Sequence, residues 1–365
     1  MAASSIDSVD DQHDRAVGGP IIDIHAHHVP PTLIAEARRN GDSYRVRIEN
    51  DDAGNERLAF TDGPTLRPFF EALCDLEGRL PRMDDNGIDV QVVSTWTDIA
   101  GYHLPKREGA RWARLQNDTM ADAARHLPDR FQAMGTLPMQ DVPQALQEMR
   151  YAVFQLGFRS FEVCTNVNGR DLDDDEYRPF WALAAEMDVL VFLHPPVQQV
   201  GVERLGQYFL NNLLGNPMET TIAATRLIFS GLLQEFPRLK CLLAHGGGFL
   251  PFQIGRLDHG YTAVPANRVH LRQPPSRFLP SFFYDTILFN DQALAYLLNV
   301  VPVERVVLGS DYPFEMCDDD LPARLKRINL DRDGLAAVLG RTAEQLLGSA
   351  PGRDENVATA EPCVS

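Results

Sequence analysis

The sequence predicts an α/β protein built as a (β/α)₈ TIM barrel, and three observations carry this prediction. A chain of 365 residues, 44% of them hydrophobic, can bury a core of this size. Short apolar runs rich in β-branched residues alternate with longer segments of helical periodicity, which is typical of repeated βα units. Eight such runs occur, the strand number of this barrel. The expected strands are 21–24, 90–94, 132–137, 160–164, 189–193, 241–244, 282–286 and 306–308.

The connections between these strands also have interpretable patterns. The segments VPQALQEMRYAVFQLG and YRPFWALAAEMD have the periodicity of helices that cover a sheet. The stretch SYRVRIENDDAGNERLAFTDG has two alternating runs around a polar turn, which predicts a small β-hairpin inserted after the first strand, within about residues 28–66. We expect the barrel over residues 21–348. Residues 1–20 and 349–365 are polar and aperiodic, so we expect flexible tails there.

Charge and cysteine content narrow the setting. Asp and Glu outnumber Lys and Arg by 51 to 34, a net charge of -17, which disfavours nucleic acid and anionic membranes as partners. The five cysteines have no paired spacing, so a reducing compartment fits better than a disulfide framework. We see neither an export signal nor eighteen consecutive apolar residues, and we therefore expect a cytoplasmic protein without a membrane span.

Three of the ten histidines fall in the segment IIDIHAHHVPP, directly behind the first expected strand. Residues two apart on a strand point to the same face, so His25 and His27 project together while His28 points the other way. Two neighbouring imidazoles form half of a metal site. A spacing of two residues also occurs by chance, so this pair alone does not establish the site.

Other candidate ligands follow later strands. His194 ends VLVFLHPP, His245 ends KCLLAHGGG and Asp311 follows RVVLGSDYPF. Taken singly, a histidine after an apolar run is often a hydrogen-bonded core residue, and Asp311 could simply begin a turn. In a parallel barrel, however, the carboxyl ends of the strands meet at one face, where active sites form. Joint placement with His25 and His27 therefore predicts a site for one divalent ion, Zn²⁺ or Mn²⁺.

The same segments carry a family resemblance that extends from residue 21 to about 348. The motifs DIHAHHVP, MGTLPMQ, NPMETTIA, FPRLKCLLAHGGGFLPFQIGRLDHGY and LGSDYPF resemble the amidohydrolase superfamily, in particular its branch of 2-amino-3-carboxymuconate-6-semialdehyde decarboxylase and related metal-dependent decarboxylases. This resemblance implies that His25, His27, His194 and Asp311 bind one metal. It also implies that His245 is the catalytic acid or base beside them, with Asp311 part of the catalytic group.

The local chemistry agrees with this assignment. A divalent ion held by three neutral imidazoles and one carboxylate keeps positive charge, which can acidify water or polarise a substrate oxygen. An ordinary histidine pKa of about 6.5 suits proton transfer by His245 near neutral pH. The glycines at 246–248 either let the backbone approach a ligand or simply form a tight turn. The segment FRSFEVCTNVN lacks the lysine with which binuclear members of the superfamily bridge two metals, so we expect one metal.

Five further residues are expected to bind the substrate. Arg67 and Arg256 match arginines that bind the substrate carboxylate in the family, and the second reaches the neighbouring subunit's site, which implies a homodimer. Either arginine could instead form a surface salt bridge. Phe314 and Trp96 are expected near the pocket, although core packing explains them equally well. Asn212 is expected there as well.

Two departures from the branch bear on the substrate. Pro196 and Asn212 stand where the decarboxylase that these motifs resemble has tryptophans, so the pocket should differ in shape and polarity. The leading hypothesis is a metal-dependent, non-oxidative decarboxylase of a small aromatic or muconate-type carboxylic acid, with no organic cofactor. The alternative is a hydrolase or hydratase of a lactone, amide or unsaturated dicarboxylate at the same site. A third hypothesis is a metal-stabilised binding protein without turnover.

Overall fold

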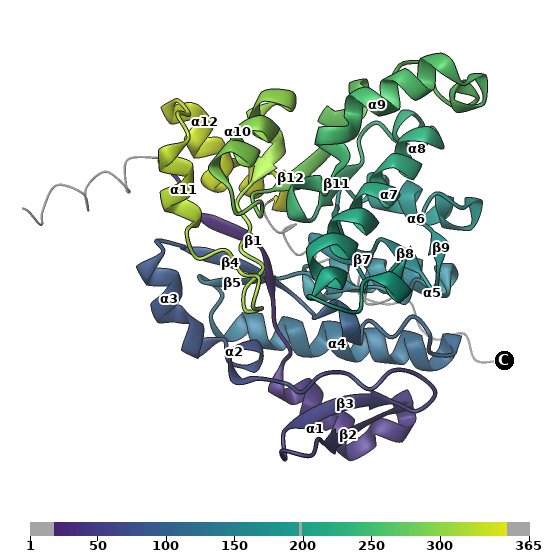
Figure 1. Cartoon of the computed structure of the whole chain (residues 1–365). Helices are drawn as coiled ribbons and strands as arrows, with labels where there is room; N and C mark the ends of the chain where they lie inside the picture. The colour runs from purple at the N-terminus through teal and green to yellow at the C-terminus, as the bar shows by residue number, and fades with distance from the viewer. Residues whose placement is uncertain (1–17, 197–198, 349–365) are drawn as a thin grey trace, which may run out of the picture.

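Eight parallel strands form the closed barrel that the sequence predicts, in a computed structural model that describes residues 18–196 and 199–348 (Figure 1). Both expected tails lie outside these residues, apart from 18–20. In order around the ring, the strands are β1 (Ile22–His27), β4 (Val90–Ser94), β5 and β6 (Phe131–Ala133 and Gly135–Thr136), β7 (Ser160–Cys164), β10 (Leu190–His194), β11 (Lys240–Leu243), β12 (Phe282–Asp285) and β13 (Val306–Val307).

Two places in the ring depart from a regular ladder. Met134 separates β5 from β6, so the third strand of the barrel is assigned in two pieces. The ring closes between the first and last strands, where Ile24 N donates to Leu308 O at 2.9 Å and His27 N donates to Tyr312 O at 2.7 Å. This seam between the two ends of the barrel chain leads directly to the predicted metal ligands.

Helices surround the ring and fill the connections between strands (Figure 1). They are α1 (Pro31–Asn40), α2 (Glu71–Cys74), α3 (Leu80–Asp85), α4 (Lys106–His126), α5 (Val142–Tyr151), α6 (Arg178–Glu186), α7 (Asn216–Phe229), α8 (Leu232–Glu235), α9 (Leu250–Ala263), α10 (Asp291–Val300), α11 (Leu321–Arg327), α12 (Arg332–Ala336) and α13 (Thr342–Leu347). Proline stands in the first turn of α5, α6, α7 and α9, where its missing N–H is not needed. Among the described helices, none combines the length and apolarity needed to cross a membrane.

The segment with two alternating runs forms an antiparallel pair, β2 (Val46–Asn50) with β3 (Glu56–Phe60). Together with α1 this pair lies beyond α4, outside the ring of strands (Figure 1). Its buried residues Val46, Leu58 and Phe60 share one apolar cluster with Trp96 and Trp112, which belong to the barrel. The hairpin is therefore packed onto the barrel through a common core. A second, shorter pair joins β8 (Asn166–Val167) to β9 (Arg170–Asp171).

The barrel interior is apolar beneath the predicted site. Its side chains come from successive strands and fill the ring, and the buried cluster includes Ile22, Ile24, Val92, Met134, Leu190, Phe192, Leu242, Phe283 and Val307. A larger apolar cluster lies between the strands and the surrounding helices. Burial on both faces explains why each strand appears in the sequence as a continuous apolar run. The first polar side chains above this interior stand at the carboxyl ends of the strands.

Candidate metal centre and active site

Five predicted side chains converge at the carboxyl end of the barrel. Asp311 Oδ1 lies 3.5 Å from His25 Nε2 and 3.3 Å from His27 Nε2. The other Asp311 oxygen, Oδ2, lies 3.6 Å from His245 Nε2. The ring centroid of His194 lies 5.0 Å from that of His27 and 5.5 Å from that of His245. Residues far apart in the sequence therefore meet at one point, as the strand-end positions predict.

A bulge in β1 helps to place the first two histidines. Asp23 pairs with Gln91 and Ala26 pairs with Val93, so β1 has one more residue than β4 over this stretch. Bulges of this kind redirect side chains next to active sites. His28 points away from the cluster, as expected, and its Nδ1 lies 2.9 Å from the carbonyl oxygen of Leu73.

The hydrogen bonds of the histidines leave nitrogen lone pairs directed into the cluster. His25 Nδ1 donates to Asp285 Oδ2 at 2.8 Å, because a carboxylate can only accept. His194 Nδ1 donates to its neighbour's carbonyl oxygen, Pro195 O, at 3.0 Å. In its neutral form each of these rings therefore has a lone pair on Nε2.

One of these nitrogens, His194 Nε2, is buried and has no hydrogen-bond partner among the described residues. His25 Nε2 faces His27 Nε2 at 3.2 Å. A buried acceptor without a partner destabilises the fold, and a cation at this point would satisfy His194 Nε2 and could also bind His25 Nε2 and His27 Nε2. The residues present thus fit a divalent ion with nitrogen and oxygen ligands.

Two overlapping groups of side chains are close enough to share an ion. One comprises His25, His194, His245 and Asp311, and the other comprises His27, Glu162 and His194; within each group the ligand atoms lie within 4.8 Å of one another. His245 is therefore near enough to be a ligand, and its assignment as acid or base stays a prediction. Glu162, a buried residue of β7 that sequence reasoning did not select, has a pKa raised to about 8 by burial.

The electrostatics of the cluster favour positive charge. Burial opposes the protonation of His25, but the carboxylates of Asp285 and Asp311 outweigh it and raise its pKa to about 10. Burial likewise opposes ionisation of Asp311, yet hydrogen bonds from three histidines hold the pKa of its carboxyl well below its usual range. The pKa of His194 is lowered well below its ordinary value by burial and the neighbouring imidazoles. A divalent ion supplies the positive charge that this arrangement stabilises.

Asp285 is the principal residue that sequence reasoning missed. It ends β12, is fully buried, and accepts hydrogen bonds from His25 Nδ1 at 2.8 Å, His245 N at 2.9 Å and Gly246 N at 2.8 Å. One carboxylate thus orients a predicted ligand and also holds the loop of the predicted acid or base. Its position at the end of an expected strand was the available signal, the same one that selected Asp311.

His245 and Asp311 share an uncommon backbone conformation, with φ of 57° and 62° respectively. Side chains other than glycine rarely adopt this left-handed region, and such residues gather at functional sites where the surrounding structure holds them. The backbone of Asp311 is held by its own N–H, which donates to His25 O at 2.8 Å. The strain falls on the two residues for which a catalytic role is predicted.

The glycines after His245 serve the turn. Gly246, Gly247 and Gly248 all have positive φ. A Cβ at these positions would lie 2.6 Å from a Leu288 side-chain carbon, 2.7 Å from the Tyr284 ring and 2.1 Å from the Pro217 carbonyl oxygen, respectively. Glycine is therefore required by the turn and its packing. Of the two explanations open from sequence, the structure supports the tight turn.

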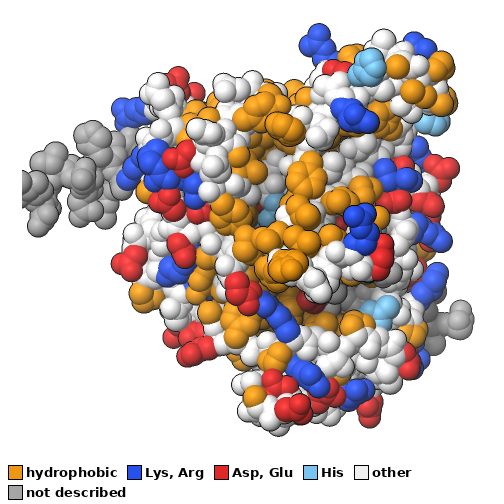
Figure 2. Space-filling model, in the orientation of Figure 1, with side chains coloured by type: hydrophobic (Ala, Val, Ile, Leu, Met, Phe, Trp, Pro, Cys, Tyr) orange, Lys and Arg blue, Asp and Glu red, His pale blue; other side chains and the backbone are white. Residues whose placement is uncertain are grey.

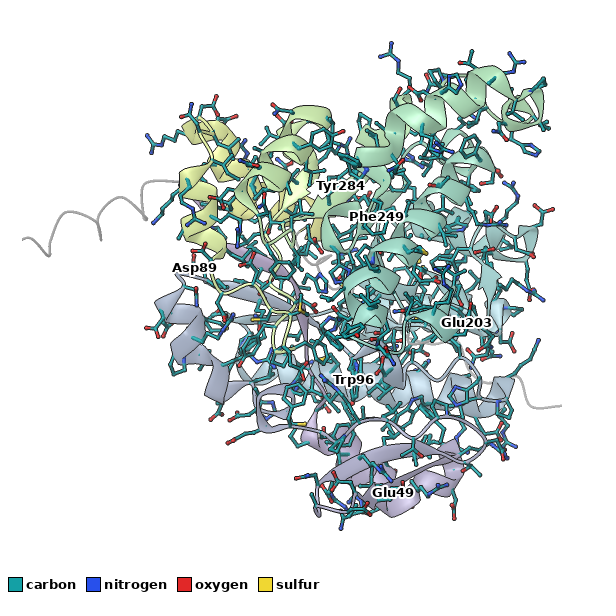
Figure 3. All side chains as sticks on the ribbon, viewed as in Figure 1. Glu49, Asp89, Trp96, Glu203, Phe249 and Tyr284 are labelled. Carbon is teal, nitrogen blue, oxygen red and sulfur yellow. The ribbon has the colours of Figure 1, made fainter. Side chains whose placement is uncertain are left out.

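A cavity of about 190 Å³ opens above the cluster and contains four of the five predicted substrate-binding residues. Arg67, Trp96, Asn212 and Phe314 line it together with His194, Asp311 and others. Figure 3 shows Trp96 between the barrel and the hairpin, and Figure 2 shows hydrophobic side chains gathered on the face that carries α7, α9 and α10.

Arg67 reaches this cavity because its segment runs alongside the hairpin, where Leu66 N donates to Leu58 O at 2.9 Å. The guanidinium carbon lies 5.3 Å from the ring of Phe70, 5.5 Å from that of Trp96 and 5.1 Å from that of Phe314. These distances are within the range of cation–π attraction. The aromatic residues expected near the pocket therefore surround the arginine expected to bind the acid.

Arg256 is placed differently. It lies on α9, where its side chain is exposed, and it does not line the described cavities over the metal cluster. Within a single chain, the structure brings Arg67 to the site and leaves Arg256 outside it. The predicted role of Arg256 in a neighbouring subunit's site is not tested by one chain.

Asp98 is a third acidic residue that sequence reasoning missed. It is partly buried, lines the cavity beside Arg67 and also lines an adjoining cavity of about 340 Å³. Burial raises the pKa of its carboxyl to about 7, although Arg67 opposes the shift. The only signal in the sequence was its place just after the second strand, and an isolated aspartate there resembles an ordinary turn residue.

Comparison with known proteins identifies the family. A family profile described as Amidohydrolase matches residues 22–349. The chain belongs to the amidohydrolase family. A 2-amino-3-carboxymuconate-6-semialdehyde decarboxylase from Dictyostelium discoideum is 31% identical over 340 residues, which cover 91% of this chain and 92% of that protein.

Further relatives within this family are decarboxylases. A gamma-resorcylate decarboxylase from Rhodococcus jostii is 34% identical over 278 residues, covering 72% of this amidohydrolase and 84% of the relative. The crystal structure of 5-carboxyvanillate decarboxylase from Sphingomonas paucimobilis superposes with a TM-score of 0.75 at 26% identity, covering 90% of this chain and 98% of that one. The chain therefore belongs to the decarboxylase branch that its motifs resemble.

Proposed function

We propose that this amidohydrolase is a carboxy-lyase that removes CO₂, without oxidation, from a small aromatic or muconate-type carboxylic acid. The observation that carries the proposal is the convergence of His25 Nε2, His27 Nε2 and the unpartnered His194 Nε2 beside Asp311, below a cavity that Arg67 lines; the partner of His194 is lacking among the described residues. A site for an acid and a site for a cation thus adjoin each other. The decarboxylase names of its relatives support the same reaction.

Four side chains would hold the metal: His25, His27, His194 and Asp311. Bound there, Zn²⁺ or Mn²⁺ would supply positive charge that polarises a substrate oxygen and acidifies nearby water. The choice between the two ions is left open by three imidazoles and a carboxylate, since both accept this set. We propose a single ion, because the segment of β7, SFEVC, offers no lysine to bridge a second.

The remaining steps belong to the chain's own residues. Arg67 binds the substrate carboxylate and orients it over the cluster. Protonated His245 delivers its proton to the unsaturated carbon that bears the carboxylate, and this carbon becomes tetrahedral. The C–C bond then breaks, its electron pair returns to the ring or conjugated system, and CO₂ leaves. His245 recovers a proton from solvent. Its Nδ1 is buried and has no hydrogen-bond partner among the described residues.

We also propose a homodimer in which Arg256 lies near the partner's site. In support, α9 exposes apolar surface next to this arginine: Phe252 is 74% exposed, and its ring lies 6.0 Å from that of Tyr296. An apolar face beside an exposed cation suits a contact between copies. Mixing inactive His245→Asn and Arg256→Ala subunits should restore activity, because some dimers then carry one intact site. Absence of any restoration would argue against the shared site.

The reaction itself is tested by product mass. Metal-loaded protein is incubated with 2,6-dihydroxybenzoate, 5-carboxyvanillate and 2-amino-3-carboxymuconate-6-semialdehyde, and CO₂ and products are measured. Decarboxylation lowers the substrate mass by about 44 daltons, whereas the alternative hydrolase or hydratase activity raises it by about 18. Release of no CO₂ together with gain of water would overturn the proposal in favour of that alternative.

A further inference from the structure

A carboxylate of the chain already occupies the arginine proposed to bind the substrate acid. Arg67 Nη1 donates to Glu315 Oε1 at 2.8 Å and to Glu315 Oε2 at 3.0 Å. Both residues line the cavity that also contains Asp311 and His194. An incoming acid would present the same functional group to the same donor.

The side chains of Arg67 and Glu315 differ in their contacts and in their exposure to solvent. The Arg67 guanidinium lies among three aromatic rings and its side chain is 38% exposed. The Glu315 side chain is 67% exposed and lies on the segment that follows Asp311 and Phe314. Leaving Arg67 would move Glu315 into solvent, where a carboxylate is well hydrated. Exposed ion pairs contribute little free energy, so replacing Glu315 by the substrate carboxylate at Arg67 costs little free energy.

The cavity is lined by more carboxylates than cationic side chains, so Glu315 and a bound acid would compete for Arg67. Asp98, Asp311 and Glu315 line it with Arg67 as their cationic counterpart. Partial burial opposes ionisation of Glu315, but its own backbone N–H and Arg67 lower the pKa of its carboxyl, which therefore carries charge near neutral pH. Two carboxylates on one guanidinium repel each other, so Glu315 weakens acid binding whether it leaves or stays.

We propose that Glu315 is a specificity-determining residue of this site: it competes with the substrate carboxylate for Arg67, so that acids bind by displacing it and neutral analogues do not. This inference rests on the proposed function of Arg67. Glu315 weakens the binding of the acid in the ground state and in the transition state alike, because Arg67 holds the carboxylate in both. It therefore raises KM and leaves the chemical step unchanged. When CO₂ has left, Glu315 pairs again with Arg67, which is then not left without an anion.

The test replaces Glu315 by Gln and by Ala in metal-loaded, full-length protein. Calorimetric titration with 2,6-dihydroxybenzoate should give a Kd lowered about two- to fivefold, the range of an exposed ion pair, while the neutral 2,6-dihydroxybenzamide binds as to the wild type. For the acid of the panel that turns over, KM should fall by the same factor, and kcat should stay within about twofold.

Two controls separate this role from others. Glu49→Gln makes the same charge change on the hairpin, where Glu49 pairs with Arg47 and Arg57 outside the cavity (Figure 3), and should leave Kd unchanged. In an Arg67→Ala background, Glu315→Gln should have no effect on Kd, because the guanidinium for which Glu315 and the acid compete is absent.

Each other outcome counts against the inference. A higher Kd in both Glu315 variants would mean that Glu315 positions Arg67 for the acid. An unchanged Kd, or no binding to any variant, would mean that a freed Arg67 gains nothing with a carboxylate. If Arg67→Ala itself raises Kd and KM while the Glu315 variants do not lower them, only this inference fails. If Arg67→Ala changes neither, the proposed function of Arg67 fails as well.

Discussion

The cluster of histidines around Asp311 and the mouth of the cavity differ in burial and in the segments that carry their residues. In the cluster, His25 and His27 are fully buried on β1, and the Nδ1 of His25 is fixed by the carboxylate of Asp285. At the mouth, Arg67 and Glu315 come from segments outside the strands and their side chains are 38% and 67% exposed. The barrel thus positions the residues of the proposed chemistry, whereas the proposed recognition of the acid depends on segments that can change without disturbing the barrel.

The largest expected effect breaks the cluster at its proposed acid. Replacing His245 by Asn should lower kcat by about a thousandfold or more, because proton delivery is lost. Metal content by elemental analysis should stay at that of the wild type. Loss of metal would instead make His245 a ligand, which its place in the group with His25 and Asp311 permits. Unchanged turnover would mean that His245 is not the acid. If wild-type protein binds the ligand without turnover and His245→Asn binds it equally well, a binding protein is favoured.

A second change weakens the cluster through its support. Asp285→Asn removes the charge that orients His25 Nδ1 and should reduce metal affinity about tenfold to hundredfold. Affinity is measured by competition with a chelator. Asp291→Asn is the matched control, since Asp291 pairs with Arg324 and Arg327 away from the cavity. Equal affinity in the two variants would show that the Asp285 contact does not tune the metal.

At the mouth, Arg67→Ala should act on binding. A charge-assisted hydrogen bond to the substrate carboxylate is lost, so KM should rise about tenfold to hundredfold with metal content unchanged. Steady-state kinetics with the best acid of the panel measures this. Arg47→Ala, which removes an arginine from the hairpin, should leave KM unaltered. A loss of metal on replacing Arg67 would contradict the separation of the two regions.

The smallest effect concerns Asp98 and stability. Burial raises the pKa of its carboxyl in the folded protein to about 7, from an ordinary 3.8. Ionising it therefore destabilises the fold, a penalty that is absent below about pH 4 and complete above pH 7. Asp98→Asn should raise Tm by about 2–4 °C at pH 8 and by less at pH 5. Thermal denaturation of the wild type and the variant at both pH values measures this difference. A larger rise in Tm at pH 5 than at pH 8 would contradict the expected direction of the pKa shift of Asp98.

The contrast between the two regions also explains what sequence could predict. The strands were predictable because burial on both faces makes each an apolar run, and His25, His194 and Asp311 follow such runs directly. The division of the third strand at Met134 could not be predicted, because no pattern in the sequence marks it. Asp285 and Asp98 were missed because a single carboxylate after a strand resembles a turn residue, and its partners lie far away in the sequence.

Residues at the mouth were harder to predict for a different reason. Arg67 reaches the cavity through a hairpin whose packing on Trp96 no local pattern encodes, and its pairing with Glu315 joins residues 248 positions apart. The role proposed for Arg256 depends on a second chain. Contacts of this kind come from tertiary structure, so the motif matches named the residues without giving their neighbours.

The seam of the barrel has a consequence for biosynthesis. Because β1 opens the ring and β13 closes it, with Ile24 bonded to Leu308, His25 and His27 cannot meet Asp311 until the chain has been synthesised beyond that residue. Binding of the proposed metal by all four ligands would then follow synthesis of the whole barrel. A nascent chain arrested at residue 300 should retain zinc far less tightly than the finished protein, which equilibrium dialysis of the two would reveal.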